Sequence, residues 1–587
     1  MKILCLKSSL FVNGYMSLSL AKILKPLLLS IFLVISTNIS LAQNVRSSSK
    51  KAIRNFEKAM SSFLNKDYDK SLSYVNEAIR SDSSFTDAIL LKAELLTEMN
   101  DDLAAIETYE LLFKTDSMAF PRAALALSKL YDNRYVYDKS VDILQWFLSL
   151  NNQKESLREY ADSQLQLCLF RKELFENPVE YNPRNLGDVV NTSADEYVNQ
   201  YYVNESKLIF TKRYKSDSPD DIYLKENIFV TNVIDSIFTI PVFLFEGKDA
   251  DDLGAANISA DGNTVYFSIC GREDGLGSCD IYYSELRNGQ WSEAINLRAI
   301  NTSSWESQPC ISHDGNELYF VRLDSRKGTS DIFVSKRNDD GTWNEAERLN
   351  HNVNSDGNEM APFIHHDGKT LYFSSDGHKG MGGYDLFVAR RDDNSDWTES
   401  ENLGYPINTN GDEINLVVSN DAVKAFISAK RADGYGGYDI YEFELKDEYR
   451  PQAVEIEIPS VEDLYAAAMR KGTSISLRDI YFEFDSYELR QDSEKGLDAL
   501  ATFLNDYPDV GIELSGHTDD MGDEEYNWRL SERRAESVRE ALINKGISSD
   551  RIKTKGCGSS QPLFPNNFDD ELRALNRRVS MTFVKEF

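Results

Sequence analysis

Short apolar and aromatic runs recur at a fixed interval in the middle of the chain. Each run follows an Asp-Gly turn, and the three turns are 53 residues apart: Asp261-Gly262, Asp314-Gly315 and Asp367-Gly368. A second series of runs opens on an acidic residue, at Asp280, Asp331, Asp385 and Asp439. Short strands joined by such turns at this spacing predict the blades of an all-β propeller over residues 178–446.

The two ends of this β region share a motif. Asn402-Leu403-Gly404 recurs as Asn185-Leu186-Gly187, whereas no such segment follows the last strand, near Asp439. The segment before Asn185 is therefore predicted to complete the last blade and close the ring, which leaves no free sheet edge. A weaker strand pair, at Leu208–Phe210 and Asp221–Tyr223, brings the expected number of blades to five, with six as the alternative.

Residues 43–177 carry a different period. Small and acidic residues recur 34 residues apart: Ala59, Ser71 and Asp82 become Ala93, Ala105 and Asp116, and a third copy has Ser128 and Ser140. Small residues allow antiparallel helices to approach closely, and this period resembles tetratricopeptide (TPR) repeats. We expect an all-α solenoid with a capping helix through Leu174. It is either simple helical packing or a groove for a protein partner.

The N-terminus has the pattern of a secretory signal peptide. An apolar run from Pro26 to Ser36 follows Lys22 and Lys25, and Ser40-Leu41-Ala42 provides a cleavage site. The run is shorter than the roughly 20 residues that span a bilayer, so an export signal over residues 1–42 is favoured over an anchor. We expect no transmembrane span in the mature chain.

After a predicted linker at 447–474, the pattern over 475–587 alternates strands and helices, as in an α/β domain. The motifs are Tyr481–Asp485, Leu514–Asp519, Tyr526–Ser531, Arg533–Ala535, Gly556–Pro562 and Asn576–Val579. Together and in this order they strongly resemble the OmpA-like peptidoglycan-binding domain. The resemblance implies a pocket for diaminopimelate, whose far end carries an ammonium and a carboxylate on one carbon.

Recognition of that group requires an anion beside a forked cation. By position, Asp519 is expected to pair with the ammonium and Arg534 to hold the carboxylate. Helical periodicity places Arg534 half-buried beside the apolar stripe and Arg533 toward solvent. The resemblance adds Asp485, Asn527 and Arg577, with Thr518 in the wall; Asn527 is alternatively a helix cap. Arg578 is disfavoured because neighbouring strand residues face opposite sides.

Composition excludes several functions. The chain of 587 residues has a formal net charge of −32, which disfavours binding to nucleic acid. We expect no enzyme activity and no cofactor, because no Gly-x-Ser-x-Gly or His-Glu-x-x-His motif occurs. No metal site is expected: His365 and His366 would point to opposite faces of a strand, and Asn352–Gly357 only partly resembles a calcium loop.

Six cysteines are too few for a disulfide scaffold. In an oxidising compartment a bond between Cys270 and Cys279, which flank one turn, is a reasonable expectation that the sequence leaves open.

The β repeats resemble TolB-like propellers, and the order of domains resembles Bacteroidota envelope proteins of the OmpA family. One branch, the PorE-like proteins, serves type IX secretion but has an additional domain for which the linker leaves no room. The expected function is a periplasmic scaffold at the outer membrane that binds the peptidoglycan stem peptide and holds envelope proteins, including secretion components. The alternative is a sensor whose propeller binds a peptide or glycan.

Overall fold

The computed structural model describes residues 46–151, 153–202, 207–215, 224–234, 237–245, 252–287, 290–391, 396–454, 475–477, 480, 482, 485–563, 573 and 576–584. The predicted signal peptide lies outside them. By internal contacts the chain divides into Met1–Val179 with Lys379–Met381 and Gly404–Pro406, and Glu180–His378 with Gly382–Leu403 and Ile407–Phe587. No helix in the described ranges has the length and apolar character needed to cross a bilayer.

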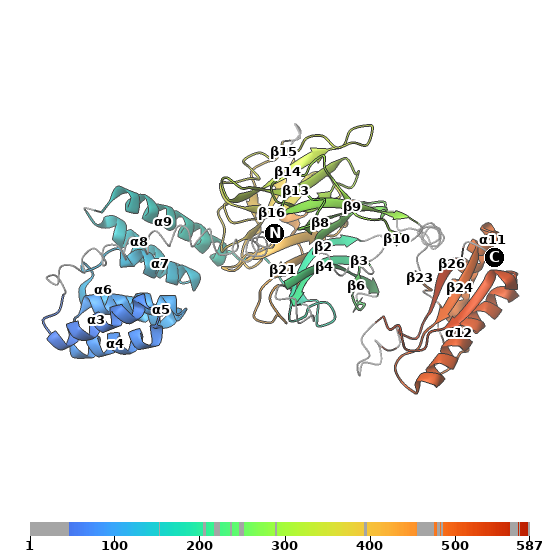
Figure 1. Cartoon of the computed structure of the whole chain (residues 1–587), viewed down its shortest axis with the longest axis horizontal. Helices are drawn as coiled ribbons and strands as arrows, with labels where there is room; N and C mark the ends of the chain where they lie inside the picture. Colours follow the sequence, from blue (N-terminus) through green and yellow to red (C-terminus); the bar gives the residue numbers. More distant parts are fainter. Residues whose placement is uncertain are drawn as a thin grey trace. The chain divides into compact units, whose positions relative to one another are not determined.

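The first unit is helical. Its described helices are α3 (Lys50–Leu64), α4 (Tyr68–Ser81), α5 (Thr86–Glu98), α6 (Asp102–Asp116), α7 (Ala123–Asn133), α8 (Tyr137–Ser149) and α9 (Glu155–Glu176) (Figure 1). The repeated small residues lie where paired helices touch. Ser71 Oγ donates to the Ala59 carbonyl, and Ser140 Oγ to that of Ser128, each over 2.9 Å. The intervening pair, Ala93 and Ala105, is fully buried.

The β region consists of five small sheets. The first contains β2 (Asp195–Tyr202), β3 (Lys207–Lys215), β4 (Leu224–Ile234), β5 (Ile237–Phe238) and β6 (Val242–Phe243); the second contains β7 (Leu253–Ile258), β8 (Thr264–Cys270), β9 (Cys279–Arg287), β10 (Gln290–Trp291) and β11 (Ile295–Asn296). The third contains β12 (Glu306–Ile311), β13 (Glu317–Asp324), β14 (Thr329–Lys336) and β15 (Glu347–Arg348); the fourth contains β16 (Glu359–Ile364), β17 (Thr370–Ser375), β18 (Asp385–Arg390) and β19 (Glu401–Asn402).

The fifth sheet joins the two ends of the region. It contains β20 (Glu413–Val418), β21 (Lys424–Ala429), β22 (Asp439–Glu444) and β1 (Arg184–Asn185), in the order β1-β22-β21-β20. β1 pairs antiparallel with β22, with Arg184 opposite Glu442. The first strands β2, β7, β12, β16 and β20 contact one another in a closed cycle, so the five sheets are arranged around one axis.

Two expectations from the sequence differ from the described structure of the β region. The strand expected at Asp221–Tyr223 lies outside the described residues, and the strand that pairs with β3 is β4, where Phe229 lies opposite Phe210. The first part of the predicted linker packs on the β region: Tyr449 is buried, and its carbonyl accepts a 2.6 Å hydrogen bond from the Tyr372 hydroxyl.

Asn, Thr or Ser, and Glu side chains form a hydrogen-bonded triad that recurs in the β region. A buried Asn bonds both backbone groups of a strand in the preceding sheet; Asn301, for example, bonds the N–H and carbonyl of Ile281 at 2.9 and 2.8 Å. The next residue, Thr302, donates from its N–H and hydroxyl to Glu306, which is fully buried. The triad occurs four times: Asn191-Thr192-Glu196, Asn301-Thr302-Glu306, Asn354-Ser355-Glu359 and Asn408-Thr409-Glu413.

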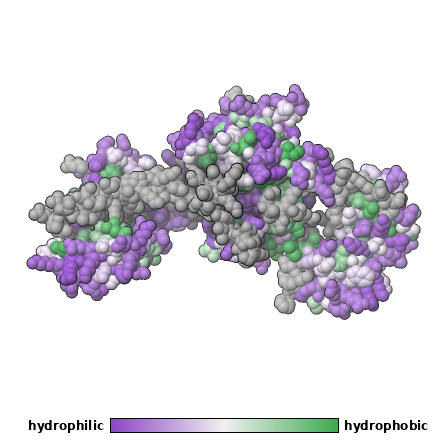
Figure 2. Space-filling view, viewed as in Figure 1, coloured by the Kyte–Doolittle hydropathy of each residue, from purple (hydrophilic) through white to green (hydrophobic). Residues whose placement is uncertain are grey.

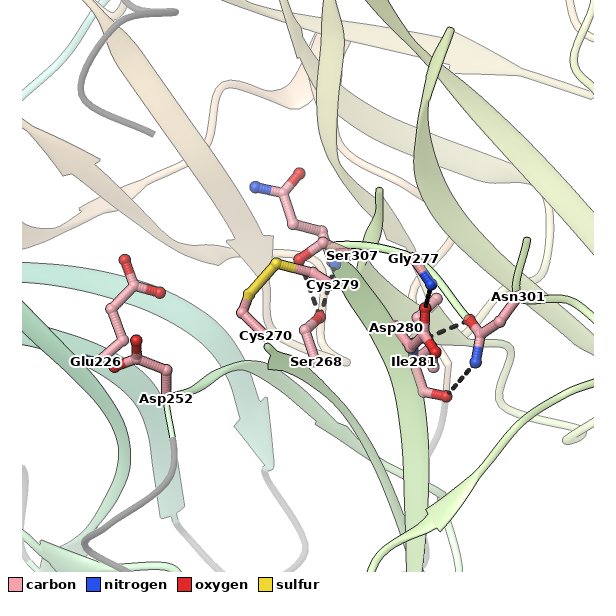
Figure 3. The surroundings of a disulfide bond; sticks show 11 residues. Glu226, Asp252, Ser268, Cys270, Gly277, Cys279, Asp280, Ile281, Asn301 and Ser307 are labelled. Atoms are coloured by element: carbon pink, nitrogen blue, oxygen red, sulfur yellow. Dashed lines mark hydrogen bonds between the residues drawn. A yellow bond between two sulfur atoms is a disulfide. The ribbon is translucent and has the colours of Figure 1, made fainter. Parts of the chain in front are cut away.

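The cysteine pair of the second sheet is bonded. Cys270 and Cys279 are directly opposite in the β8–β9 ladder, with Cα atoms 4.0 Å apart, and form a disulfide (Figure 3). Nearby, the Ser268 and Ser307 hydroxyls hydrogen-bond at 2.8 Å and connect this sheet to the next. The bond therefore closes a hairpin that is already paired.

In the described part of the C-terminal domain, a four-stranded sheet packs with the two long helices named below. β24 (Gly511–Gly516) lies between β25 (Ile552–Gly556), to which it is parallel, and β26 (Val579–Val584); β23 (Ile475–Ser476) is at the edge. The helices are α11 (Glu494–Asp506) and α12 (Glu524–Asn544), and α12 contacts β24 and β25 (Figure 1). A Cβ on Gly516 would lie 1.9 Å from the Ser531 carbonyl, so glycine is needed for this approach. Most of the strand expected at Asp479–Asp485 lies outside the described residues.

Candidate ligand site in the C-terminal domain

Asp519 is held near the end of β24 by an arginine from the neighbouring strand segment. Arg577 Nη1 donates to Asp519 Oδ2 at 2.6 Å, and the Met521 N–H donates to Oδ1 at 3.2 Å. The Asp519 side chain is 9% exposed and that of Arg577 23%. The ion pair is thus mostly buried, with Arg577 more open to solvent than Asp519.

Arg534 comes from α12 and is more buried than the sequence predicted. Its residue exposure is 1%, whereas helical periodicity suggested a half-buried side chain. Nε donates to the Ser486 carbonyl at 3.0 Å, and Nη1 to the His517 carbonyl at 3.3 Å. These bonds fix the guanidinium, while Nη2 donates to none of the described residues.

The charges around Arg534 oppose one another. Burial and the neighbouring Arg577 lower the pKa of Arg534 to about 10, although Asp519 and Asp485 act in the opposite direction. The guanidinium therefore remains protonated near pH 7 but is incompletely neutralised. An added carboxylate would be stabilised there because a buried cation gains most from a nearby anion.

Asp485 adds a second carboxylate near Arg534, and Asn527 is a buried residue near the start of α12. Asp485 has φ +51°, and its carboxylate accepts a 2.8 Å hydrogen bond from the Tyr526 hydroxyl. Asn527 is 2% exposed, but it does not cap α12, because Asp523 does so through the Tyr526 N–H. The capping alternative for Asn527 is therefore wrong. The contact from Tyr526 was not predicted, although that residue is part of the motif.

Thr518 and His517 bring unsatisfied polar atoms to the site. Thr518 is 2% exposed, and its hydroxyl has no hydrogen-bond partner among the described residues. His517 Nε2 lies 3.0 Å from Ser580 Oγ, and burial with the nearby Arg578 and Lys555 lowers the pKa of His517 to about 3. The ring is therefore neutral at pH 7. A buried hydroxyl without a partner costs free energy that a ligand could recover.

The preference for Arg577 over Arg578 agrees with the contacts. Arg577 reaches Asp519, whereas Arg578 Nη2 donates to the Gln561 carbonyl at 3.1 Å. Arg533 is exposed and stacks over Tyr487, with its guanidinium carbon 5.4 Å from the ring centre. The site thus brings together Asp519, Arg577 and Arg534, and leaves Arg533 and Arg578 out.

The sequence pattern of the OmpA family matches residues 481–577. The C-terminal domain belongs to the OmpA family. The match covers α11, α12, β24, β25 and all six predicted site residues; the edge strand β23, the last strand β26 and the helical and β regions lie outside it.

Curated relatives agree over this domain. Outer membrane porin F of Pseudomonas aeruginosa is 40% identical over 17% of this chain and 29% of its own. Peptidoglycan-associated lipoprotein of Rhizobium meliloti is 38% identical over 14% and 48%. Outer membrane protein A of Bordetella avium is 41% identical over 18% and 54%. This chain thus spans only about a third to a half of these relatives, and their names are those of envelope proteins rather than enzymes.

Outside the OmpA-family domain, the argument about His365 and His366 needs correction. β16 ends at Ile364, so the alternation of strand faces does not apply, and the two rings stack with centres 6.0 Å apart. No group of three metal-ligating His, Cys, Asp or Glu residues occurs in the part of the chain that the structure describes. In the loop that partly resembles a calcium site, Asn354 instead bonds the backbone of Ile332.

Proposed function

We propose that the protein is a cell-envelope scaffold that binds peptidoglycan through its OmpA-family domain. The observation that carries this proposal is the set of Asp519, Arg577 and Arg534, one anion between two cations at the end of one sheet. Membership of the OmpA family and the similarity to a peptidoglycan-associated lipoprotein support the same ligand and a location at the outer membrane.

The site has the chemistry for the zwitterionic end of diaminopimelate. The ammonium would pair with Asp519, whose carboxylate is already held by Arg577. The carboxylate would receive charge-assisted bonds from Arg534 Nη2 and Arg577, since guanidinium groups bind carboxylates in a forked geometry. The Thr518 hydroxyl would find a partner on the stem peptide, with Asp485 and Asn527 beside it.

The other regions are proposed to bind proteins of the envelope. Five sheets around one axis, with β1 completing the fifth, support a five-bladed TolB-like propeller. Seven helices over residues 50–176 support a TPR-like array. Hydrophilic residues cover much of the described surface in view in Figure 2. An accessory role in type IX secretion is one form of this function.

The test is sedimentation of the full mature chain with purified cell-wall sacculi. We expect co-sedimentation with diaminopimelate-type peptidoglycan and much weaker binding to lysine-type peptidoglycan, because lysine lacks the second carboxylate. Asp519→Asn and Arg534→Lys should each abolish or strongly reduce sedimentation. Asp519→Asn preserves the shape of the side chain, and Arg534→Lys keeps the charge but loses the fork.

Matched controls separate the site from general charge effects. Asp509→Ala and Arg533→Ala remove exposed charges of the same domain and should bind as the wild type does. Equal sedimentation of wild type and both site variants would refute the proposed pocket. Failure of the wild type to sediment with either wall would refute peptidoglycan binding itself.

A further inference from the structure

One end of the β region carries two adjacent imidazoles. After four of the five first strands the chain enters the same tight turn, and the second residue beyond the strand is Ala260, His313, His366 or Asn420. The strands β12 and β16, which precede the two histidines, contact each other within the closed cycle. The repeat therefore places His313 and His366 next to each other at one rim of the cycle.

The turn itself does not require these histidines. The side chain that holds the turn together belongs to the first residue after each strand, which is Ser259, Ser312, His365 or Ser419. The serines bond within their own turns; Ser312 Oγ, for example, donates to Asp314 and accepts from the Glu317 N–H. His365 also bonds within its own turn, since its Nδ1 accepts from the Asp367 N–H at 3.1 Å. At the second position, by contrast, alanine and asparagine are equally compatible with the fold.

The two rings are close, and that of His366 has an unpartnered nitrogen. The ring centres of His313 and His366 are 4.7 Å apart, with 37° between the planes. His366 Nδ1 is buried and has no hydrogen-bond partner among the described residues, and His313 is exposed at the surface. The unpartnered Nδ1 of His366 thus belongs to a ring that lies against the exposed ring of His313.

The nearest carboxylate, that of Asp367, is bonded within its own turn. The Asp367 carboxylate is occupied by the Lys369 and Thr370 N–H groups of its own turn. It therefore does not compete for the imidazoles.

We propose that His313 and His366 together bind a divalent transition-metal ion of the Zn²⁺, Ni²⁺ or Cu²⁺ class. Imidazole nitrogen suits these ions, whereas Ca²⁺ and Mg²⁺ prefer oxygen. Two protein ligands leave the other coordination positions to water or to a side chain of a bound partner. This site is separate from the peptidoglycan pocket and does not depend on the function proposed for it.

The other four histidines do not form such a pair. His365 uses both ring nitrogens, with Nε2 3.1 Å from the Ser419 carbonyl. His378 and His517 each have one nitrogen near a carbonyl or hydroxyl, and neither stacks on another histidine among the described residues. His351 is exposed and provides a natural control.

The test is a calorimetric titration of the chelator-treated full chain with NiCl₂, and separately with ZnCl₂. Excess Ca²⁺ in the buffer occupies the many surface carboxylates. We expect the wild type to bind one specific ion per chain. His313→Ala and His366→Asn should each bind the ion at least about tenfold more weakly than the wild type. These variants copy residues that the same turn already has at Ala260 and Asn420, so the fold should be retained.

A second measurement guards against misfolding. Both variants should have the thermal unfolding midpoint of the wild type without metal, and His351→Ala should bind the ion as the wild type does. Absence of a specific site in the wild type would overturn the proposal. So would binding that survives in both variants, or a loss in His351→Ala equal to theirs.

Discussion

The β region and the OmpA-family domain both bury carboxylates, but they satisfy them differently. In the β region Glu306 is fully buried and accepts from Thr302 and from Arg322, so each bond is internal and the triad recurs in other sheets. In the OmpA-family domain Asp519 occurs once, lies at the end of a strand and pairs with a partly exposed arginine. Repetition with complete satisfaction indicates a structural role, whereas the unique and incompletely neutralised set around Asp519 is the one for which we propose a ligand.

The largest expected effect on stability comes from Glu306→Ala. The substitution leaves the Arg322 guanidinium, now 2.8 Å from Glu306, without its carboxylate, and removes the acceptor of the Thr302 N–H. Breaking a buried ion pair in this way costs about 3–5 kcal/mol. Denaturant unfolding should show this loss, and hydrogen exchange should locate it in β12 and β13. Glu345→Ala, at an exposed position, is the control. An equal loss of stability there would show that the bonds of Glu306 do not explain the effect.

A smaller loss is expected from the double substitution Cys270→Ser with Cys279→Ser. The bond closes a loop of nine residues, for which the chain-entropy estimate is about 2–3 kcal/mol. In the wild type, reductant should lower the free energy of unfolding by the same amount as the double substitution does. In the double variant, reductant should leave it unchanged. Cys557→Ser, at a free cysteine, should behave as the wild type does. A reductant effect that persists in the double variant would contradict the assignment.

Asn301→Ala should cost about 2 kcal/mol. The amide holds both backbone groups of Ile281, and buried groups left without partners lose roughly this amount. Hydrogen exchange of β9 should accelerate before that of the other sheets. Asn344→Ala, an exposed asparagine, should leave the unfolding midpoint unchanged. Uniform acceleration across all sheets would argue against the triad as a local link.

The β region should also become less stable as the pH rises through neutrality. Burial raises the pKa of Glu359 to about 7, above its ordinary 4.5, and that of Glu413 likewise. The folded state therefore binds these protons more tightly than the unfolded state, so the contribution is complete below about pH 4.5 and is lost as pH passes 7. The thermal midpoint should fall by a few degrees between pH 5.5 and 8. Glu359→Gln should make this fall in the thermal midpoint smaller. An unchanged fall in the variant would contradict a contribution from the Glu359 proton.

The smallest effect on stability is expected from Asp519→Asn. Asparagine keeps an oxygen that can accept from the Arg577 guanidinium, so the free energy of unfolding should change less than in Glu306→Ala. Peptidoglycan sedimentation should nevertheless be lost. A variant that loses much stability, or that retains binding, would show that Asp519 belongs with the structural carboxylates of the β region.

Much of this comparison was readable in the sequence, because it rests on local spacing. The 53-residue interval predicted the strand pairs, and the repeated Asn-Leu-Gly motif predicted the pairing of β1 with β22. Helical periodicity separated Arg534 from Arg533. The role of Asn301 was not readable, since its partner, Ile281, belongs to another sheet.

Other features depend on contacts that no spacing encodes. Arg534 is fully buried because two carbonyls, of Ser486 and His517, converge on its guanidinium from distant segments. The neighbouring rings of His313 and His366 come from turns 53 residues apart in the chain. The strand rule misled for His365 and His366 because β16 ends just before them. Long-range contacts decided the first two of these, and a local strand boundary decided the third.

The pairing of β1 with β22 has a mechanical consequence. The helical segment enters the β region just before Arg184. Beyond Glu444 the chain first packs on the β region around Tyr449 and only then continues to the OmpA-family domain, so β1 and β22 lie on the path between the two tethers. Because the pair is antiparallel, tension between a wall-bound domain and a partner-bound helical segment would open it bond by bond from one end. The bond between Tyr372 of the fourth sheet and the Tyr449 carbonyl would be loaded before the ladder, because Tyr449 lies between β22 and the OmpA-family domain. The two-residue β1–β22 ladder would open next, while the first three sheets lie outside the path of the force.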